Sequence, residues 1–248
     1  MARRVFPVRS RKAAPRLPSG TRIYAIGDIH GCAELLTEVL RHIGADITAR
    51  PVSRPIQVFL GDYIDRGPHS REVLDLLIAH RRSHQTVFLK GNHELYASEV
   101  LTNCSMVSEW MKFGGITTLV SYGVGRPGRN EDPAVRDEIA TAFRRALPES
   151  HYQFLNGLPV SFSCGDFFFV HAGVRPGIPL RFQDLHDLLW IRDEFLFHEE
   201  DFGQIVVHGH SPVMEPEVRT NRINIDTGAY ATGRLTCLVL EDDRIDFL

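Results

Sequence analysis

Cysteine is scarce in this sequence, and the few cysteines lie far apart. The four residues, Cys32, Cys104, Cys164 and Cys237, form no CxxC pair. Nothing therefore indicates a disulfide framework or a zinc site built on cysteine. The sequence also lacks an apolar run long enough to span a bilayer and a hydrophobic secretory segment. These absences predict a protein that does not insert into a membrane and that resides in a reducing cytoplasm.

Acidic residues are missing from the beginning of the chain. The first is Asp28, and six of the 28 basic residues lie within residues 1–20. The rest of the chain therefore has 22 basic against 31 acidic residues, a balance of −9. A globule this acidic is poorly suited to general nucleic-acid binding, so no nucleic-acid partner is expected. Residues 1–20 contain Pro7, Pro15 and Pro18 and are predicted to form a flexible basic arm. An organelle presequence is the alternative, although the prolines prevent a sustained amphipathic helix.

The composition of the whole chain is that of an ordinary globular protein. Its 248 residues are 43% hydrophobic and 24% charged, which is enough for one domain with a buried core over residues 21–248. In the first half, strands are predicted at 23–26, 56–60 and 86–89, and they alternate with helices predicted at 32–43 and 68–82. Gly44 is the expected end of the first helix. This order predicts an α/β fold with parallel strands and right-handed crossovers.

A helical insertion is predicted at about residues 95–156. Helix-like stretches lie at 94–100, 105–112, 116–122 and 133–147, interrupted by Gly114-Gly115 and by a turn-rich loop at 123–132. The insertion is either a cap that selects the substrate or a helical layer over one face of a sheet. The rest of the chain is richer in hairpins, with strands expected at 159–162, 167–170, 205–207, 222–225, 235–240 and 244–248, and a helix at 184–190.

Polar side chains follow the three parallel strands at the points where those strands end. Asp28 and His30 follow the first strand, Asp62, Asp65 and Arg66 follow the second, and Asn92 and His93 follow the third. Because the carboxyl ends of parallel strands meet at one edge of a sheet, these side chains are expected to converge. Carboxylate, amide and imidazole ligands suit two divalent ions, and an arginine beside them suits a phosphate.

Five short motifs in this order make the sequence resemble a known family. They are GDIHG at 27–31, GDYIDRG at 61–67, GNHE at 91–94, HAG at 171–173 and GHS at 209–211. From about residue 24 to about residue 233, the chain resembles the calcineurin-like binuclear metallophosphoesterases. Within them it is similar to the phosphoprotein phosphatase branch, with its bacterial serine/threonine phosphatases and diadenosine tetraphosphatases. The resemblance implies a β-sandwich of two mixed sheets flanked by helices.

The resemblance also implies which residues bind two metal ions. Asp28, His30 and Asp62 are expected to hold the first ion, and Asp62, Asn92, His171 and His210 the second, so that Asp62 bridges both. Manganese is the expected activating ion, with iron or zinc as alternatives. Many members of the wider superfamily have a second histidine where Pro212 lies here. One ion is therefore expected to be more exposed to water.

Further side chains match the catalytic residues of the family. Asp65 and His93 match its acid dyad, in which an imidazolium oriented by a carboxylate protonates the leaving oxygen. Arg66 and Arg192 are the expected phosphate-binding residues, because a guanidinium can pair with two phosphate oxygens. A surface ion pair is the alternative for Arg192. Tyr230 either lines the pocket or packs in the core.

These features together predict a metal-dependent enzyme that hydrolyses phosphomonoesters through attack of a metal-bridging hydroxide. A serine/threonine-type protein phosphatase, acting on a phosphoprotein, is the first expectation. A hydrolase of diadenosine polyphosphates or of another small phosphoester is the alternative. A phosphoprotein-binding module on an inactive phosphatase scaffold is disfavoured, because every ligand and dyad position is intact. No membrane partner is expected.

Overall fold

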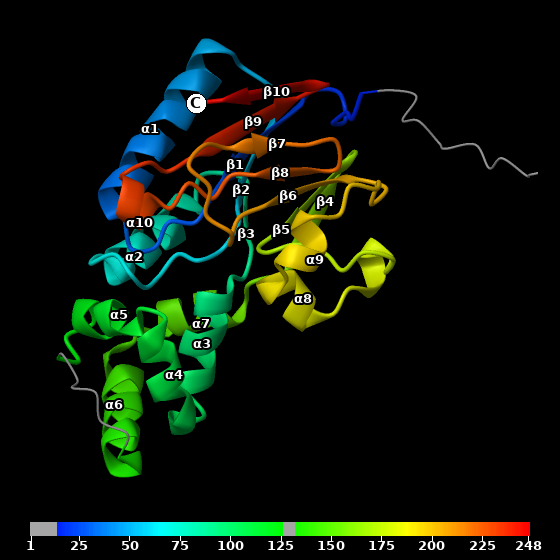
Figure 1. The fold of residues 1–248 in the computed structure, drawn as a ribbon. Helices are drawn as coiled ribbons and strands as arrows, with labels where there is room; N and C mark the ends of the chain where they lie inside the picture. The colour runs from blue at the N-terminus through cyan, green and yellow to red at the C-terminus, as the bar shows by residue number, and fades with distance from the viewer. Residues whose placement is uncertain (1–13, 126–131) are drawn as a thin grey trace, which may run out of the picture.

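Two five-stranded mixed sheets pack face to face and form the body of the molecule (Figure 1). The computed structural model describes residues 14–125 and 132–248. The first sheet has the order β10-β9-β1-β2-β3 and consists of β1 (Thr21–Ile26), β2 (Arg54–Phe59), β3 (Thr86–Phe88), β9 (Cys237–Glu241) and β10 (Arg244–Phe247). The second has the order β4-β5-β6-β8-β7 and consists of β4 (Ser161–Cys164), β5 (Phe167–Val170), β6 (Ile205–His208), β7 (Glu217–Val218) and β8 (Arg222–Asn224). The predicted sandwich of two mixed sheets is confirmed.

The core between the sheets follows from the alternation of side chains along the strands. In β1, Ile23 and Ala25 point between the sheets and join residues of the second sheet, such as Val207, in one buried cluster. Tyr24 and Ile26 point to the opposite face, where they join a second buried cluster with the helices. Both faces of β1 are therefore covered. This explains why its last four residues are all buried and why none of them is strongly polar.

Strands β1, β2 and β3 run parallel, and α1 (Ala33–Ala49) and α2 (Ser70–His80) connect them. Helix α1 corrects one expectation, because Gly44 does not end it and the helix continues to Ala49. Asp46, which lies beyond this glycine, accepts hydrogen bonds from Tyr24 at 2.6 Å and from Arg22 at 3.3 Å. These contacts with β1 outweigh the cost of about 1 kcal/mol that a glycine adds to a helix.

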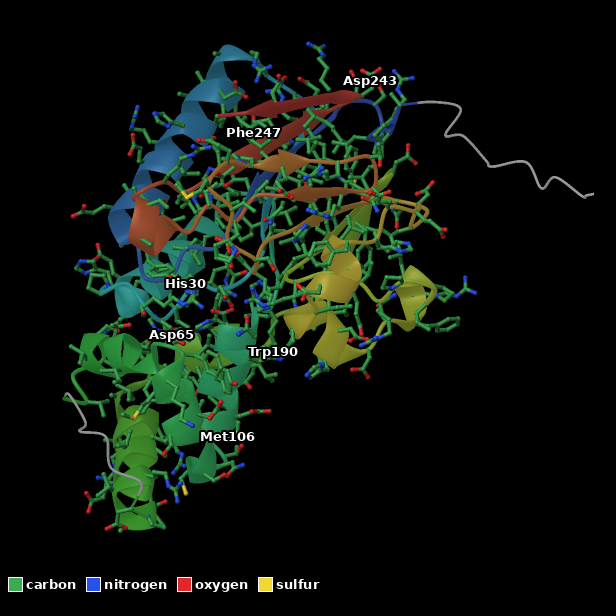
Figure 2. The ribbon with its side chains drawn as sticks, viewed as in Figure 1. His30, Asp65, Met106, Trp190, Asp243 and Phe247 are labelled. Carbon is green, nitrogen blue, oxygen red and sulfur yellow. The ribbon has the colours of Figure 1, made fainter. Side chains whose placement is uncertain are left out.

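The predicted helical insertion lies beside the sandwich, and Asp65 lies at the junction between the two (Figures 1 and 2). It contains α3 (Asn92–Val100), the 3-10 helix η1 (Cys104–Met106), α4 (Val107–Lys112), α5 (Gly115–Ser121), α6 (Pro133–Ala146) and α7 (Glu149–Asn156). The predicted stretch at 105–112 divides into η1 and α4, and α7 is additional. Part of the predicted loop at 123–132 lies outside the described residues. Trp110 and Phe143 of the insertion belong to the same buried cluster as Tyr24 of β1.

The second half of the chain also contains short helices. These are the 3-10 helix η2 (Leu180–Phe182), α8 (Leu185–Trp190), α9 (Asp193–Leu196) and α10 (Ala229–Thr232). Helices α8 and α9 lie beside the second sheet, and α10 lies near α1 (Figure 1). The strands and the helix predicted for this half are confirmed to within two residues, whereas β7, α9 and α10 are too short for the sequence pattern to indicate. Within the described parts of the chain, no helix is both long and apolar enough to cross a bilayer.

The chain near residue 16 is attached to the sandwich, which corrects the expectation of a flexible arm up to residue 20. Leu17 is buried, and its N–H donates to the Asp242 carbonyl at 2.8 Å. The Arg16 N–H donates to the Asp166 carboxylate at 2.8 Å, and the Asp166 N–H donates to the Arg16 carbonyl at 3.0 Å. The part of the expected arm at 1–13 lies outside the described residues.

Candidate active site

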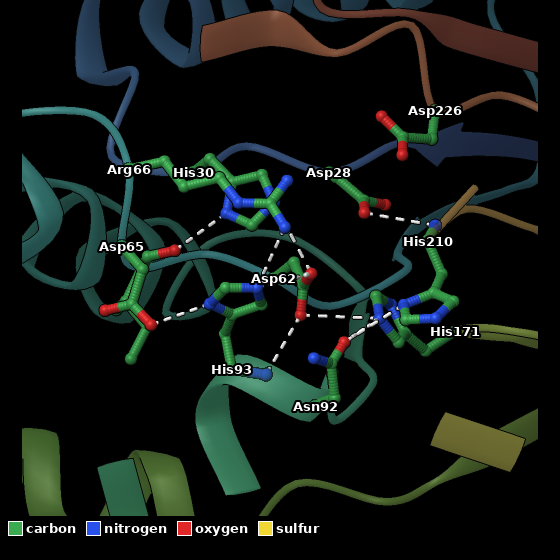
Figure 3. A network of polar contacts seen from close by, with 12 residues as sticks. Asp28, His30, Asp62, Asp65, Arg66, Asn92, His93, His171, His210 and Asp226 are labelled. Atoms are coloured by element: carbon green, nitrogen blue, oxygen red, sulfur yellow. Dashed lines mark hydrogen bonds and ion pairs between the residues drawn. The ribbon is translucent and has the colours of Figure 1, made fainter. Parts of the chain in front are cut away.

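Loops at the carboxyl ends of five strands bring the predicted metal ligands together (Figure 3). Asp28 and His30 follow β1, Asp62 follows β2, Asn92 follows β3, His171 follows β5 and His210 follows β6. None of these six side chains is more than 6% exposed. The structure therefore places every predicted ligand in one buried cluster to which both sheets contribute.

The backbone of the site adopts conformations that ordinary residues avoid. Of the six non-glycine residues with positive φ in the described chain, five lie here: His30, Asp62, Asp65, Arg66 and His210. Such a conformation costs a non-glycine residue on the order of 1–3 kcal/mol. A neighbouring glycine makes the close packing possible, since a Cβ on Gly209 would lie 2.1 Å from Asp28 Oδ1. The fold thus holds these side chains in place against a local penalty, which is typical of functional sites.

Asp62 lies between two groups of candidate ligands. Its Oδ2 lies 3.4 Å from His30 Nε2, and its Oδ1 lies 3.4 Å from His171 Nε2. On the second side, Asn92 Oδ1 lies 2.9 Å from His171 Nε2 and 3.1 Å from His210 Nδ1. One carboxylate thus faces both groups with different oxygens, as a ligand that bridges two ions requires.

Several polar side-chain atoms of the predicted ligands lack a hydrogen-bond partner in the described protein. Asp28 Oδ1, His30 Nε2 and His210 Nε2 are buried and make no hydrogen bond. Leaving such an atom unsatisfied costs about 1–3 kcal/mol. His30 Nδ1–H donates to the Ile64 carbonyl at 2.9 Å, which leaves the Nε2 lone pair directed into the site, as in metal-binding histidines. This donor set fits divalent ions such as Mn²⁺, Fe²⁺ or Zn²⁺.

The second ligand group brings two hydrogen-bond acceptors face to face. His171 Nδ1–H donates to the Leu60 carbonyl at 3.0 Å. Burial lowers the pKa of His171 below its usual value, so the ring is neutral and its Nε2 is an acceptor. This nitrogen lies 2.9 Å from Asn92 Oδ1. Two acceptors at that distance repel each other, and a cation bound by both would remove the repulsion.

Several buried carboxylates lie close together in the site. Burial raises the pKa of Asp28 well above its usual value, and the carboxylates of Asp226 and Asp62 raise it further. Burial also raises the pKa of Asp226 to about 6. Burial lowers the pKa of His30 to about 3, so this ring is neutral. Divalent ions would supply the charge that this cluster needs.

Two acidic residues belong to the site although they are not among the predicted site residues. Asp226 lies beside Asp28 (Figure 3), and it follows the buried strand β8 as Asp28 follows β1. Glu94, in the GNHE motif, accepts the N–H groups of Asp62 and Tyr63 at 2.8 Å and of Gly91 at 2.9 Å. Glu94 therefore fixes the backbone that carries the shared carboxylate.

His93 and Asp65 are in contact, as the motifs predict. His93 Nδ1 lies 2.7 Å from Asp65 Oδ2, so its N–H donates to this carboxylate. His93 Nε2 lies 3.7 Å from Asp62 Oδ2 and 3.3 Å from Arg66 Nη2, and it therefore faces the ligand cluster. Burial alone would lower the pKa of His93, but the carboxylates of Asp62 and Asp65 raise it above its usual value. The ring is thus suited to carry a proton beside the cluster.

The two predicted arginines lie beside different ligand groups. Arg66 contacts His93, and its guanidinium lies 5.0 Å from the centre of the Tyr230 ring. Arg192 Nη2 donates to the His210 carbonyl at 3.2 Å. Tyr230 is 45% exposed, which places it at the surface beside the site rather than in the core. Each ligand group thus has one guanidinium nearby, which suits the binding of an anion.

The sandwich, the shared carboxylate and the histidine–aspartate pair define a metallophosphoesterase. The chain belongs to the calcineurin-like phosphoesterase family, whose family model matches residues 21–246. The resemblance that the five motifs carry is thereby confirmed. Members of this family are metal-dependent hydrolases, and this protein is an enzyme of that class.

Relatives and solved structures are similar over most of the chain. The asymmetrical bis(5'-nucleosyl)-tetraphosphatase PrpE of Anoxybacillus flavithermus is 28% identical in an alignment of length 235, which covers 86% of this chain and 88% of that protein. The protein of the same name from Oceanobacillus iheyensis is 28% identical in an alignment of length 226, which covers 87% of each chain. A cold-active protein tyrosine phosphatase has a TM-score of 0.63 at 16% identity, covering 94% of this chain and 81% of that one. A protein serine/threonine phosphatase from Saccharomyces cerevisiae has a TM-score of 0.58 at 15% identity, covering 92% and 79%; both structures show the fold alone.

Proposed function

We propose that this enzyme uses two divalent ions to hydrolyse P–O bonds of phosphoesters or phosphoanhydrides, and that dinucleoside polyphosphates, which are cleaved at a phosphoanhydride bond, are its first substrate class. The observation that carries the two-ion proposal is Asp62, whose two oxygens face different ligand groups. The first ion would be held by Asp28, His30 and Asp62, and the second by Asp62, Asn92, His171 and His210. Divalent ions bound there, with Mn²⁺ as the proposed activating ion, would supply Lewis-acid activation of water and neutralise charge at the phosphoryl group.

The chain's own side chains would bind the substrate and protonate the leaving group. Arg66 and Arg192 would bind phosphoryl oxygens, because a guanidinium stays charged and offers paired donors. His93 would donate the proton on Nε2 to the leaving oxygen, since this nitrogen faces the ligand cluster. Asp65 would hold the imidazole through Nδ1 at 2.7 Å and stabilise its protonated form.

Two substrate classes are supported by different observations. Dinucleoside polyphosphates are supported by the names of relatives that are 28% identical over 86% and 87% of this chain. Phosphoproteins are supported by the buried pair of His93 and Asp65, because the alkoxide of serine or threonine is a poor leaving group that needs a proton. We place dinucleoside polyphosphates first, which reverses the order that the motifs favour.

A substrate panel tests this order. The ratio kcat/KM is measured with added Mn²⁺ for diadenosine tetraphosphate, a phosphoserine peptide and a phosphotyrosine peptide. We expect diadenosine tetraphosphate to be preferred by at least about 10-fold, because each further charge-assisted hydrogen bond to a phosphate contributes about 1.5–3 kcal/mol. A preference of that size for a phosphopeptide would favour a protein phosphatase instead. Hydrolysis of none of the three would contradict the proposed function itself.

Removal of the metal is expected to abolish hydrolysis. Dialysis against a chelator should lower kcat for p-nitrophenyl phosphate by at least about 10³-fold, because metal ions contribute several kcal/mol of charge stabilisation. Titration of the metal-free protein with Mn²⁺, followed by calorimetry, should show about two binding sites per chain, and activity should return as they fill. Full activity in excess chelator would contradict metal dependence, and binding of a single ion would contradict a shared Asp62.

A further inference from the structure

The Asp65 carboxylate is held by the helical insertion as well as by His93. Trp110 Nε1–H, on α4, donates to Asp65 Oδ2 at 2.8 Å. The Thr118 hydroxyl, on α5, donates to Asp65 Oδ1 at 2.5 Å. Asp65 and Trp110 are fully buried and Thr118 is 1% exposed, so water has no access to replace either donor. Both oxygens are therefore fixed by residues that lie 45 and 53 positions further along the chain.

The same part of the insertion holds the backbone of the Asp65 loop. The Asp65 N–H lies 2.9 Å from Thr118 Oγ1 and 3.0 Å from Ser70 Oγ. The Arg66 N–H donates to the Gly114 carbonyl at 3.3 Å. Asp65 and Arg66 have φ values of 71° and 63°. Such values persist only where surrounding contacts support them. Here α5 and its preceding turn provide the contacts from Thr118 and Gly114, and Ser70 at the start of α2 provides the third.

The glycine pair at the start of α5 allows the tryptophan to reach Asp65. Gly114 has a φ of 107°, which L side chains rarely adopt. A Cβ on Gly115 would lie 2.6 Å from the Trp110 ring, so a glycine lets the indole lie directly against the backbone of α5. The Phe143 ring packs on the indole at 5.1 Å between ring centres. Trp110 is thus held in one place with its N–H toward the carboxylate.

We propose that Trp110 and Thr118 are positioning residues for proton transfer to the leaving group, which makes α4 and α5 part of the catalytic machinery. The inference rests on the proposed roles of His93 and Asp65. It gives the helical insertion a role in catalysis, in addition to the two roles expected from the sequence, which are a cap that selects the substrate and a helical layer over one face of a sheet. With both oxygens fixed, the carboxylate presents Oδ2 to His93 Nδ1 in one orientation, which keeps His93 Nε2 directed at the ligand cluster. A buried carboxylate without these donors would lose hydrogen bonds that nothing replaces, and its orientation would no longer be defined.

Trp110→Phe and Thr118→Val test this inference, because each removes one donor to the Asp65 carboxylate and keeps most of the side-chain volume; Thr118→Val also removes an acceptor of the Asp65 N–H. We expect kcat for an alkyl phosphate to fall about 10- to 100-fold, the effect of losing one hydrogen bond to a charged group, while KM changes less than about twofold. For p-nitrophenyl phosphate, whose leaving group departs as a stable anion, kcat should fall less than about threefold. Thr118→Ser retains the hydroxyl and should restore hydrolysis of the alkyl phosphate.

Tyr122→Phe is the matched control within the insertion. Tyr122 is also a buried aromatic residue with one buried hydrogen bond, which joins its hydroxyl to His151 Nδ1 at 2.6 Å rather than to Asp65. This variant should lower the melting temperature but leave the ratio of the two activities unchanged. Equal losses for both esters in Trp110→Phe and Thr118→Val would overturn the positioning role.

The comparison with His93→Ala separates this inference from the proposed function. If His93→Ala lowers hydrolysis of both esters equally, the proposed acid is wrong and the positioning role is wrong with it. If His93→Ala affects the alkyl phosphate selectively but Trp110→Phe and Thr118→Val do not, the role of His93 as the acid is supported and the positioning role of Trp110 and Thr118 is wrong. Selective loss in all three variants supports both.

Discussion

Asp62→Asn is expected to lose metal from both ligand groups and at least about 10³-fold in kcat, because bound ions contribute several kcal/mol to the transition state. The two Asp62 oxygens each lie 3.4 Å from a histidine of a different group, His30 and His171. An amide of the same size has no negative charge and offers one acceptor oxygen in place of two. Metal content per chain after gel filtration and kcat for p-nitrophenyl phosphate are the two measurements.

Two further substitutions make the result of Asp62→Asn specific. Asp62 has a φ of 52°, which asparagine tolerates, so the variant should fold. Asp28→Asn should weaken chiefly one site, because Asp28 belongs to one ligand group. Asp75→Asn is the surface control, since this side chain is 63% exposed and pairs with His151 instead of a proposed ligand. If Asp62→Asn retains two ions and normal turnover, Asp62 does not bridge them, and Asp226 becomes the carboxylate to test.

The parallel core of the fold can be predicted from sequence because its strands are buried on both faces. The apolar runs predicted at 23–26 and 56–60 coincide with β1 and β2 for that reason. Helix α1 shows where local signals fail, since Gly44 has the character of a helix end but Asp46 is anchored on β1 through Tyr24. Strand β7 has only two residues and exists through its pairing with β8, which no local pattern encodes.

The candidate ligands can be predicted from sequence because each lies in a short motif behind an apolar strand. The residues that position Asp65 are harder to predict, because their roles arise only when distant segments meet. Trp110 lies in an amphipathic stretch of the insertion, and nothing in that stretch indicates a carboxylate partner 45 residues earlier. The role of Thr118 is equally hard to predict, since the hydroxyl of a threonine in a helix usually forms a hydrogen bond with the backbone of its own helix. Asp226 is the intermediate case, because its place directly after the strand predicted at 222–225 is a signal that could have identified it.

His93→Ala is expected to lower kcat for an alkyl phosphate about 10²–10⁴-fold, the usual contribution of a general acid. His93 donates from Nδ1 to Asp65 at 2.7 Å, and its Nε2 faces the ligand cluster. Metal content should stay near that of the unmodified protein, because His93 is not among the proposed ligands. Rates for p-nitrophenyl, phenyl and alkyl phosphates, measured at saturating substrate and metal, check the prediction.

The dependence on the leaving group distinguishes proton donation from other roles of His93. The loss should be smallest for p-nitrophenyl phosphate, whose leaving group departs well as an anion, and largest for the alkyl phosphate. Asp65→Asn should show the same pattern more weakly, because Asp65 orients the imidazole without donating the proton. His69→Ala, at a position whose side chain is 51% exposed, is the matched control and should change no rate. His93, His30 and Asp62 have ligand atoms within 4.8 Å of one another, so a uniform loss with reduced metal content would make His93 a metal ligand and require a different acid.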